Sequence, residues 1–247
     1  MRHFGLIGRK LDHSFSAKFF NGKFAAEQID ADYQLFELET IEQLPQLLTS
    51  LHIDGFNVTI PYKESVMRYL DEISSEARMI GAVNCVEFRD GKLIGHNTDV
   101  MGIEASLHWL DTEDCRKALI LGTGGASKAV QHVLRKHQIE YMCVSRSRER
   151  GDITYEELTP EIIAEHKLII NTTPVGMFPN VEEAPNIPYE HLSSEHRAFD
   201  LVYNPATTEF LRRAKEQGAM TMGGMLMLQT QAIASWHIWR GQEEHTK

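Results

Sequence analysis

The sequence predicts an α/β protein of two domains, and three features of the chain support this fold class. Apolar runs of strand length alternate with segments whose apolar residues recur at helical spacing. A glycine-rich turn, residues 122–127, follows the apolar run 118–121 and precedes a helical segment, which is the order typical of a Rossmann-type nucleotide-binding sheet. The chain ahead of this turn is long enough for a separate α/β domain that could hold a substrate.

Each expected element follows from its local pattern. In the first part of the chain, strands are expected at 2–8, 33–38 and 55–60, helices at 16–28 and 44–51, and a hairpin over 82–96 around the turn pair Asp90-Gly91. A helix over 100–110 leads to further strands at 117–121, 141–145, 168–171, 198–203 and 220–222. Helices are expected after the glycine turn, ahead of Gly218 and over 225–239. We therefore assign residues 1–100 and 225–247 to a substrate-binding domain, to which the C-terminal helix returns, and residues 101–224 to the Rossmann domain.

The composition argues against several classes of protein. A formal net charge of −10 disfavours a general nucleic-acid binder, which carries a basic excess. The three cysteines, Cys85, Cys115 and Cys143, form no CxxC pair and the histidines show no HExxH spacing, so we expect neither disulfides nor a metal. No apolar stretch has the length of a membrane span and no signal-like region is found, so we expect a cytoplasmic protein without a membrane partner.

The glycine turn, Gly122-Thr-Gly-Gly-Ala-Ser127, has the residues that a pyrophosphate site needs. Gly122 allows the tight turn, Gly124 lets the backbone approach the phosphates, and the following helix offers free N–H groups. Ser127 replaces the third glycine of the motif and is small enough for close packing. An ordinary turn is the alternative, but the strand–helix context favours a nucleotide site. That site would consist of Gly122, Thr123, Gly124, Gly125 and Ala126.

The segment Ser145-Arg-Ser-Arg-Glu-Arg150 indicates which nucleotide binds. It follows the second strand of the Rossmann domain, where NAD-binding proteins have an acidic residue for the ribose. Guanidinium and hydroxyl groups instead suit a 2′-phosphate. The alternative is a solvated basic turn. We predict that Ser145, Arg146, Ser147 and Arg150 select NADP rather than NAD.

Polar residues also stand at element ends in the first domain. Lys63 follows a strand and a proline, Asp99 stands where the linking helix begins, and Ser14 and Ser16 precede a helix. Each has a structural alternative, namely a surface lysine, an N-cap carboxylate and capping hydroxyls. Two hydroxyls at a helix N-terminus also suit a carboxylate ligand.

These segments together resemble the shikimate dehydrogenase family over nearly the whole chain. Eight segments, in order, carry the resemblance: His13-Ser-Phe-Ser16, Asn57-Val-Thr-Ile-Pro-Tyr-Lys-Glu64, Gly81-Ala-Val-Asn84, Asn97-Thr-Asp99, Gly122-Thr-Gly-Gly-Ala-Ser127, Asn171-Thr-Thr-Pro-Val-Gly-Met177, Asp200-Leu-Val-Tyr-Asn-Pro205 and Gly224-Met-Leu-Met-Leu-Gln229. The resemblance implies an oxidoreductase that reversibly reduces 3-dehydroshikimate to shikimate with NADPH, in aromatic amino acid biosynthesis.

The resemblance also implies roles for individual residues. Lys63 and Asp99 match the catalytic pair of the family. The implied substrate contacts are Ser14, Ser16, Thr59, Asn84, Tyr203 and Gln229. The implied contacts of the nicotinamide half of the cofactor are Asn171, Thr172, Thr173 and Gly223, and Leu201 is a further cofactor contact. The chemistry is consistent, because hydride reaching a carbonyl leaves negative charge that Lys63 can neutralise and protonate while Asp99 orients the lysine.

Three departures from the family pattern accompany the match. Ala17 stands where the family usually has proline, Phe20-Asn21 where it has His-Asn, and Ser145 where asparagine is common. None of them removes a reacting group. The first one bears on the carboxylate pocket and therefore on the choice of substrate.

Other functions stay open from the sequence alone. One is a quinate/shikimate dehydrogenase of broader specificity, or a relative that uses NAD, since a single ring hydroxyl is discriminated by pocket shape. Another is a non-catalytic sensor of nucleotide and shikimate, which the presence of both Lys63 and Asp99 disfavours. A purely structural Rossmann module fits poorly with so many polar strand ends. A homodimer is compatible with the sequence.

Overall fold

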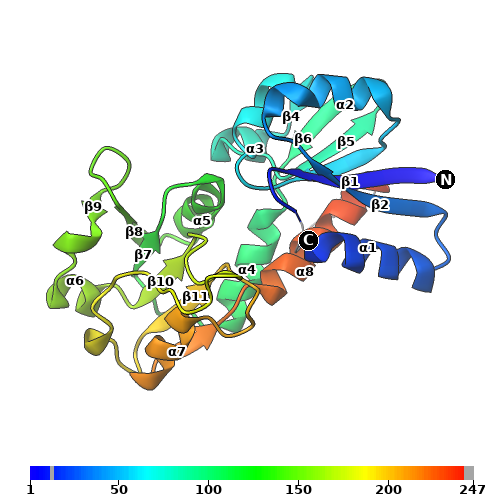
Figure 1. Cartoon of the computed structure of the whole chain (residues 1–247). Helices are drawn as coiled ribbons and strands as arrows, with labels where there is room; N and C mark the ends of the chain where they lie inside the picture. Colours follow the sequence, from blue (N-terminus) through cyan, green and yellow to red (C-terminus); the bar gives the residue numbers. More distant parts are fainter. Residues whose placement is uncertain (12–13, 242–247) are drawn as a thin grey trace. The chain divides into compact units, whose positions relative to one another are not determined.

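The structure is a computed structural model that describes residues 1–11 and 14–241 (Figure 1). His13, which belongs to one of the predicted motifs, lies outside these residues. The chain divides into two compact units. The first unit comprises Met1–Thr98 and the C-terminal segment from Ala232, and the second unit comprises Asp99–Gln231.

The first unit is built on a six-stranded mixed sheet with the order β2-β1-β3-β5-β6-β4. Its strands are β1 (Arg2–Gly8), β2 (Ala31–Glu37), β3 (Gly55–Val58), β4 (Glu72–Ile73), β5 (Cys85–Arg89) and β6 (Lys92–His96). Its helices are α1 (Phe15–Ala26), α2 (Leu44–Ser50), α3 (Ser75–Ile80) and the second part of α8 (Met225–Trp239). Strands β1, β2 and β3 are parallel, and β5 is antiparallel to both β3 and β6. The carboxyl ends of β1, β3 and β6 and the amino end of β5 therefore share one edge of the sheet.

Helices cover both faces of the first sheet. Figure 1 shows α2 and α3 on one side of the sheet and α1 and α8 on the other. Leu44 of α2 and Ala77 of α3 are buried against Phe56 and Val86 of the sheet. On the other face, aromatic residues dominate the core, since Phe20 and Phe24 of α1 and Trp236 and Trp239 of α8 surround Phe4.

Trp239 shows why the C-terminal helix returns to the first unit. Its ring stacks on Phe4 with centroids 4.7 Å apart, and its Nε1–H donates to the Val86 carbonyl at 3.0 Å. A Cβ on Gly55 would lie 2.5 Å from the indole nitrogen, so only glycine leaves room for this ring. Buried aromatic area and a satisfied indole N–H both stabilise the docked helix. The predicted return of this helix is confirmed.

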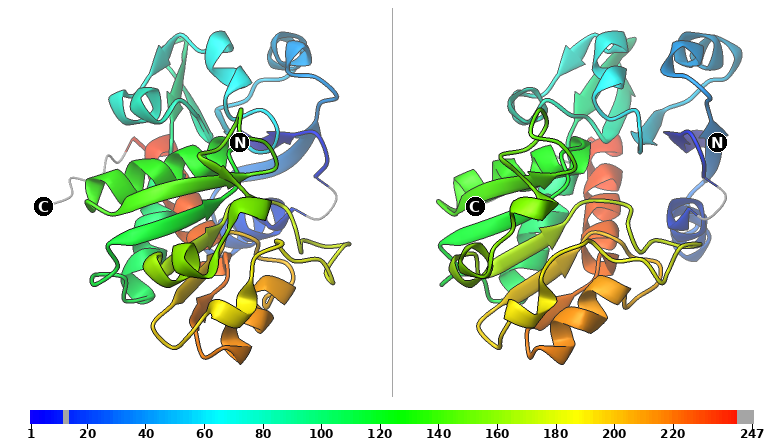
Figure 2. Two further views of the ribbon diagram at one scale, coloured as in Figure 1. Left: turned by 90° about the vertical axis from the view of Figure 1, so that its left-hand side faces the viewer. Right: turned by 60° about the vertical axis from the view of Figure 1, so that its left-hand side comes forward.

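The second unit is built on a six-stranded parallel sheet with the order β12-β11-β10-β7-β8-β9. Its strands are β7 (Lys117–Leu121), β8 (Glu140–Ser145), β9 (Ile153–Thr154), β10 (Leu168–Asn171), β11 (Arg197–Asp200) and β12 (Met220–Met222). Its helices are α4 (Asp99–Trp109), α5 (Gly125–Lys136), α6 (Pro160–Glu165), α7 (Glu209–Glu216) and the first part of α8. In Figure 2 the strands run side by side, from the green β7 and β8 to the orange β12.

The strand order of the second sheet reverses between β7 and β10. From β7 the chain passes to β8 and β9 on one side, and it then returns to β10, β11 and β12 on the other. This is the order of a Rossmann sheet, in which ligands bind at the carboxyl ends of the two strands where the order reverses. The predicted α/β fold with a Rossmann-type unit is confirmed.

The division of α8 reflects its packing. The prediction assigned the whole helix from residue 225 to the first domain, whereas the contacts of its first turns belong to the second unit. Met227 packs so closely on α4 that a Cβ on Gly102 would lie 2.5 Å from the Met227 carbonyl oxygen. The residues from Ala232 onward pack in the aromatic core of the first unit.

Some elements differ from the prediction. Strand β11 ends at Asp200 and not at 203, because the Asp200 carboxylate accepts a hydrogen bond from the Val202 N–H at 3.0 Å and turns the chain. Helices α3 and α6 were not predicted, since each has only six residues and too few turns for an apolar period to emerge. Their capping residues, Ser74 and Thr159, were the available signals.

The close contact at Gly102 generates a stability prediction. Gly102→Ala must displace the Met227 backbone, so we expect it to lower the free energy of unfolding by roughly 1–3 kcal/mol in urea denaturation. The matched control is Gly22→Ala in α1, where an added Cβ meets no atom within 4 Å. Alanine should stabilise that helix by about 0.5–1 kcal/mol. Equal effects of the two substitutions would contradict this account of the packing.

Candidate functional site

The glycine turn after β7 lies against the loop after β10. Gly122 has a φ of +106°, which favours glycine, and a Cβ there would lie 2.8 Å from the Thr172 Oγ1 and 2.9 Å from the Thr173 Cγ2. The Thr172 hydroxyl donates to the Leu121 carbonyl at 2.7 Å and holds the two loops together. The predicted residues of both loops therefore meet at the point where the strand order reverses.

Helix α5 begins directly at this turn and offers an open N-terminus. Gly124 is its N-cap, and among the described residues no side chain caps the helix and no atom lies within 4 Å of a Cβ placed on Gly124. The N–H groups of the first turn and the helix dipole therefore favour an anion at this place. Ser127, which replaces the third glycine, is fully buried on the side of α5 that faces the sheet.

The basic loop after β8 separates into two kinds of arginine. Arg148 donates to the Glu157 carboxylate at 3.0 and 2.5 Å and to the Asp152 carbonyl at 2.8 Å, so it closes the loop. Arg146 and Arg150 are exposed and form no ion pair within the part of the chain that the structure describes. The Ser145 hydroxyl accepts a hydrogen bond from the Ser147 N–H at 3.4 Å.

This loop lies beside the glycine turn. The Gly122 N–H donates to the Val144 carbonyl at 2.9 Å, which joins the ends of β7 and β8. Ser145 therefore ends, and Ser147 follows, a strand that is adjacent to the turn. The alternative interpretation of the whole segment is a solvated basic turn. Arg148 has a structural role instead, since it closes the loop on Glu157.

Asp200 organises the loops on the other side of the turn. Its carboxylate accepts hydrogen bonds from the Asn171 Nδ2 at 3.0 Å, the Val202 N–H at 3.0 Å and the Thr208 hydroxyl at 2.5 Å. The Asn171 Oδ1 in turn accepts from the Thr173 N–H at 3.0 Å and from its hydroxyl at 2.6 Å. Burial raises the pKa of Asp200 to about 6, although these hydrogen bonds act to lower it.

The remaining predicted cofactor residues lie at the same edge. The Leu201 N–H donates to the Asn171 carbonyl at 3.0 Å, and the Gly224 N–H donates to the Val202 carbonyl at 3.0 Å. A Cβ on Gly224 would lie 2.2 Å from the Leu201 carbonyl oxygen, so the backbone after β12 is pressed against the loop after β11. Leu201 is therefore a neighbour of Asn171, and Gly223 lies against the loop after β11 at the same carboxyl edge of the sheet.

The first unit gathers a second set of predicted residues. Ser14 is the N-cap of α1, and its hydroxyl accepts a hydrogen bond from the N–H of the buried Ser16 at 3.2 Å. Thr59 follows β3 and lies against the end of β1, where a Cβ on Gly8 would be 2.6 Å from the Thr59 Cγ2. Lys63 is half-buried in the loop that follows.

Asn84 completes this set, and Asp99 follows in the chain as the first residue of the second unit. The Val83 N–H donates to the Lys63 carbonyl at 2.8 Å, which fixes the segment before β5 beside the lysine loop. The buried Asn84 accepts from the Thr98 N–H at 2.7 Å and donates to the Thr98 hydroxyl at 3.0 Å. Asp99 is buried and is the first residue of α4.

The structure thus assembles the predicted residues in two groups. Ser14, Ser16, Thr59, Lys63 and Asn84 belong to the first unit. Asp99, Tyr203, Gln229 and all predicted cofactor residues belong to the second. Tyr203 is half-buried after β11, and Gln229 is exposed on α8.

The prediction missed several buried polar residues that support these groups. Asp200 stood in a predicted motif without a role, and Tyr33, Asn57, Thr98 and Ser235 were not assigned to the site. The available signal was a polar residue inside an otherwise apolar element, which must find a hydrogen-bond partner once it is buried. Among the described residues no group of three or more His, Cys, Asp or Glu could hold a metal ion, and no helix there is both long and apolar enough to span a membrane.

Known proteins match this chain over nearly its whole length. A family model described as the shikimate dehydrogenase substrate binding domain matches residues 6–86. A shikimate dehydrogenase (NADP(+)) of Clostridium beijerinckii is 41% identical over 253 residues, which cover 97% of this chain and 92% of that protein. Shikimate 5-dehydrogenase from Thermus thermophilus, solved in complex with NADP(H) and shikimate, has a TM-score of 0.87 at 32% identity and covers 98% of this chain and 94% of that one. Quinate dehydrogenase from Corynebacterium glutamicum in complex with NAD has a TM-score of 0.86 at 26% identity, covering 97% and 94%.

The fold and the glycine turn place the protein among two-unit α/β proteins with a Rossmann-type nucleotide-binding sheet. The predicted substrate residues of the first unit, and sequence matches that cover nearly the whole chain, narrow this class to one family. The chain belongs to the shikimate dehydrogenase family.

The buried Asp200 predicts a pH-dependent contribution to stability. Its pKa in the folded state is raised from 3.8 to about 6, so between these values the folded protein holds a proton that the unfolded chain has released. The contribution of Asp200 to stability therefore falls as pH rises from about 4 to 6 and is constant above that. We expect the difference in unfolding free energy between wild type and Asp200→Asn to fall by up to about 3 kcal/mol across this window. Parallel denaturation profiles of the two proteins from pH 4 to 7 would contradict the prediction.

Proposed function

We propose that this chain catalyses the reversible NADP-dependent reduction of 3-dehydroshikimate to shikimate. The observation that supports this most strongly is the match of both units to the Thermus thermophilus enzyme, whose structure contains NADP(H) and shikimate. The glycine turn, the open end of α5 and the two exposed arginines suit the nucleotide. The polar edge of the first unit suits a small hydroxylated acid.

The residues of the second unit have the chemistry to hold NADP. The pyrophosphate would lie on the turn made by Gly122, Thr123, Gly124, Gly125 and Ala126, at the N-terminus of α5. Ser145, Arg146, Ser147 and Arg150 would bind the 2′-phosphate. Asn171, Thr172, Thr173, Leu201 and Gly223 would border the nicotinamide half.

The substrate would be held by the hydroxyl and amide groups assigned from the family. Ser14 and Ser16, at the N-terminus of α1, would bind its carboxylate. Thr59, Asn84, Tyr203 and Gln229 would bind its ring hydroxyls or its carboxylate.

Lys63 and Asp99 would perform the proton chemistry. Bound NADPH supplies the hydride that reduces the C3 carbonyl. The Lys63 ammonium group stabilises the negative charge that develops on the carbonyl oxygen and gives it a proton. Asp99 orients the lysine and accepts a hydrogen bond from a substrate hydroxyl. In the oxidative direction Lys63 takes the proton back.

We also propose that the enzyme is cytoplasmic and acts as a monomer or as a homodimer. Light scattering distinguishes these two oligomeric states.

The direct test of the proposed activity is NADPH consumption by the purified protein with 3-dehydroshikimate, with 3-dehydroquinate and NADH assayed in parallel. Turnover with 3-dehydroshikimate and NADPH is expected to dominate. Comparable turnover with 3-dehydroquinate or NADH would instead indicate a broader enzyme, and no turnover by a protein that binds NADPH would indicate a sensor.

Replacing the proton donor should abolish most of the turnover. We expect Lys63→Ala to lower kcat by roughly two to four orders of magnitude with a smaller change in KM, since the lost interaction acts in the transition state. The control is Lys92→Ala. It removes an exposed lysine of β6 that pairs with Glu72 of the neighbouring edge strand β4. Near-normal turnover of Lys63→Ala would remove Lys63 from the mechanism.

The two classes of arginine in the β8 loop should differ in their effect on cofactor choice. We expect Arg146→Ala and Arg150→Ala to raise the KM for NADPH by about tenfold or more and to leave the KM for NADH unchanged, because each removes a charge-assisted hydrogen bond to the 2′-phosphate. Arg148→Ala, which instead breaks the contact with Glu157, is the matched control and should leave the NADPH/NADH preference largely intact. Steady-state kinetics with both cofactors make the comparison, and the same shift in preference for all three variants would refute it.

A further inference from the structure

A chain of buried hydrogen bonds crosses the first unit beneath its polar edge. The Tyr33 hydroxyl donates to the Asn57 Oδ1 at 2.9 Å, and the Asn57 Nδ2 donates to the Ser235 Oγ at 2.8 Å. The Ser235 hydroxyl also lies 3.1 Å from the Thr98 Oγ1. All four side chains are buried, with Tyr33 3% exposed and Ser235 fully enclosed.

One end of this chain meets the helix that carries two residues assigned to the substrate, and the other end meets a third. At the first end, Tyr33 packs on α1, whose N-cap is Ser14 and whose first turn contains Ser16. At the other end, Thr98 is bonded twice to the Asn84 side chain, and the Asn57 Nδ2 also donates to the Asn84 carbonyl at 3.1 Å. Helix α1 and Asn84 are therefore joined through groups that belong to β2, β3 and α8.

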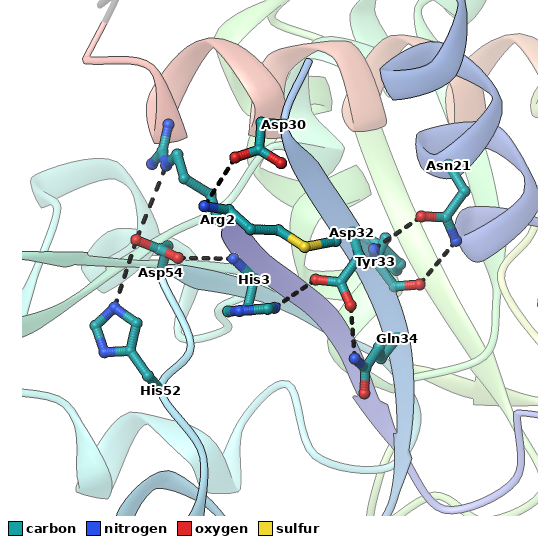
Figure 3. Close-up of polar contacts among 10 residues, drawn as sticks. Arg2, His3, Asn21, Asp30, Asp32, Tyr33, Gln34, His52 and Asp54 are labelled. Carbon is teal, nitrogen blue, oxygen red and sulfur yellow. Dashed lines mark hydrogen bonds and ion pairs between the residues drawn. The ribbon is translucent and has the colours of Figure 1, made fainter. Parts of the chain in front are cut away.

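Tyr33 is itself held in a fixed position. Its ring stacks on Phe20 with centroids 4.5 Å apart and an interplanar angle of 12°. The Asn21 side chain accepts from the Tyr33 N–H and donates to the Tyr33 carbonyl, both at 2.9 Å, as the dashed lines in Figure 3 show. The Tyr33 hydroxyl is thus anchored to the body of the unit before it meets Asn57.

We propose that Tyr33 and Ser235 are positioning residues that set the distance between the N-terminus of α1, where Ser14 and Ser16 would bind a carboxylate, and the hydroxyl-binding amide of Asn84. This inference rests on the proposed function. A cyclic hydroxy acid presents its carboxylate and its hydroxyls at fixed separations, so two groups that bind opposite ends of it must be held at one spacing. Ser235 lies on the C-terminal helix, and the hydrogen bonds of Asn57 and Thr98 carry its effect to the site.

The Ser235 hydroxyl contacts both Asn57 and Thr98, so its removal ends both contacts. Ser235→Ala leaves the Asn57 Nδ2 with one acceptor fewer and Thr98 with one partner fewer. Buried polar groups that lose a partner rearrange to find another. Tyr33→Phe keeps the ring and its stacking on Phe20 and removes only the hydroxyl that donates to Asn57.

The test is steady-state kinetics of Tyr33→Phe and Ser235→Ala with shikimate and NADP. We expect the KM for shikimate to rise roughly 5- to 30-fold in each variant, which corresponds to one lost buried hydrogen bond or two. We expect kcat to fall less and the KM for NADP to stay unchanged, because the cofactor residues belong to the second unit. Calorimetric titration with shikimate should show the same loss of affinity.

Ser106→Ala is the matched control. Ser106 is a fully buried serine of α4 whose hydroxyl donates to the Gly102 carbonyl at 2.8 Å, within its own helix. The Ser106→Ala substitution should lower the midpoint of thermal unfolding without raising the KM for shikimate. If Tyr33→Phe and Ser235→Ala behave like this control, the positioning role is overturned while the proposed function stands. If the wild type neither binds nor oxidises shikimate, the proposed function fails and this inference fails with it.

Discussion

Each unit buries a polar side chain at the carboxyl edge of its sheet, and the surrounding structure must satisfy it. Asn57 of β3 and Asp200 of β11 are almost completely enclosed. An amide or a carboxylate without partners in such a place would cost several kcal/mol. Asn57 therefore forms hydrogen bonds with Tyr33, Ser235 and Asn84, and Asp200 accepts hydrogen bonds from Asn171, Thr208 and Val202. These partners include Asn84 and Asn171, which we assign to substrate and cofactor, and Val202, which directly precedes the assigned Tyr203.

Strand direction decides which residues can take part. In the second sheet all strands are parallel, so the loops after β7, β8, β10, β11 and β12 meet at one edge. Gly122 allows the loops after β7 and β10 to pack closely, because a Cβ there would lie 2.8 Å from the Thr172 Oγ1. In the first sheet the antiparallel β5 brings its amino end to the edge where β1, β3 and β6 end. That reversal places Asn84 beside the lysine loop.

The sequence predicted the fold class, the Rossmann unit and most strands of the second sheet, because long apolar runs and a glycine turn are strong local signals. It did not predict β4, β9, α3 or α6, which are too short to show a period. The predicted end of β11 was wrong because the Asp200 side chain, and not the backbone pattern, terminates the strand.

The sequence by itself determined the family, the identity of the motif residues and the elements that carry them. Only the tertiary structure distinguished Arg148, which closes its loop on Glu157, from Arg146 and Arg150. It alone joined Asn57 to Ser235, which lies 178 positions further along the chain. Local patterns encode local conformation, whereas the partner of a buried polar group is selected by packing between distant segments, which no single stretch of sequence specifies.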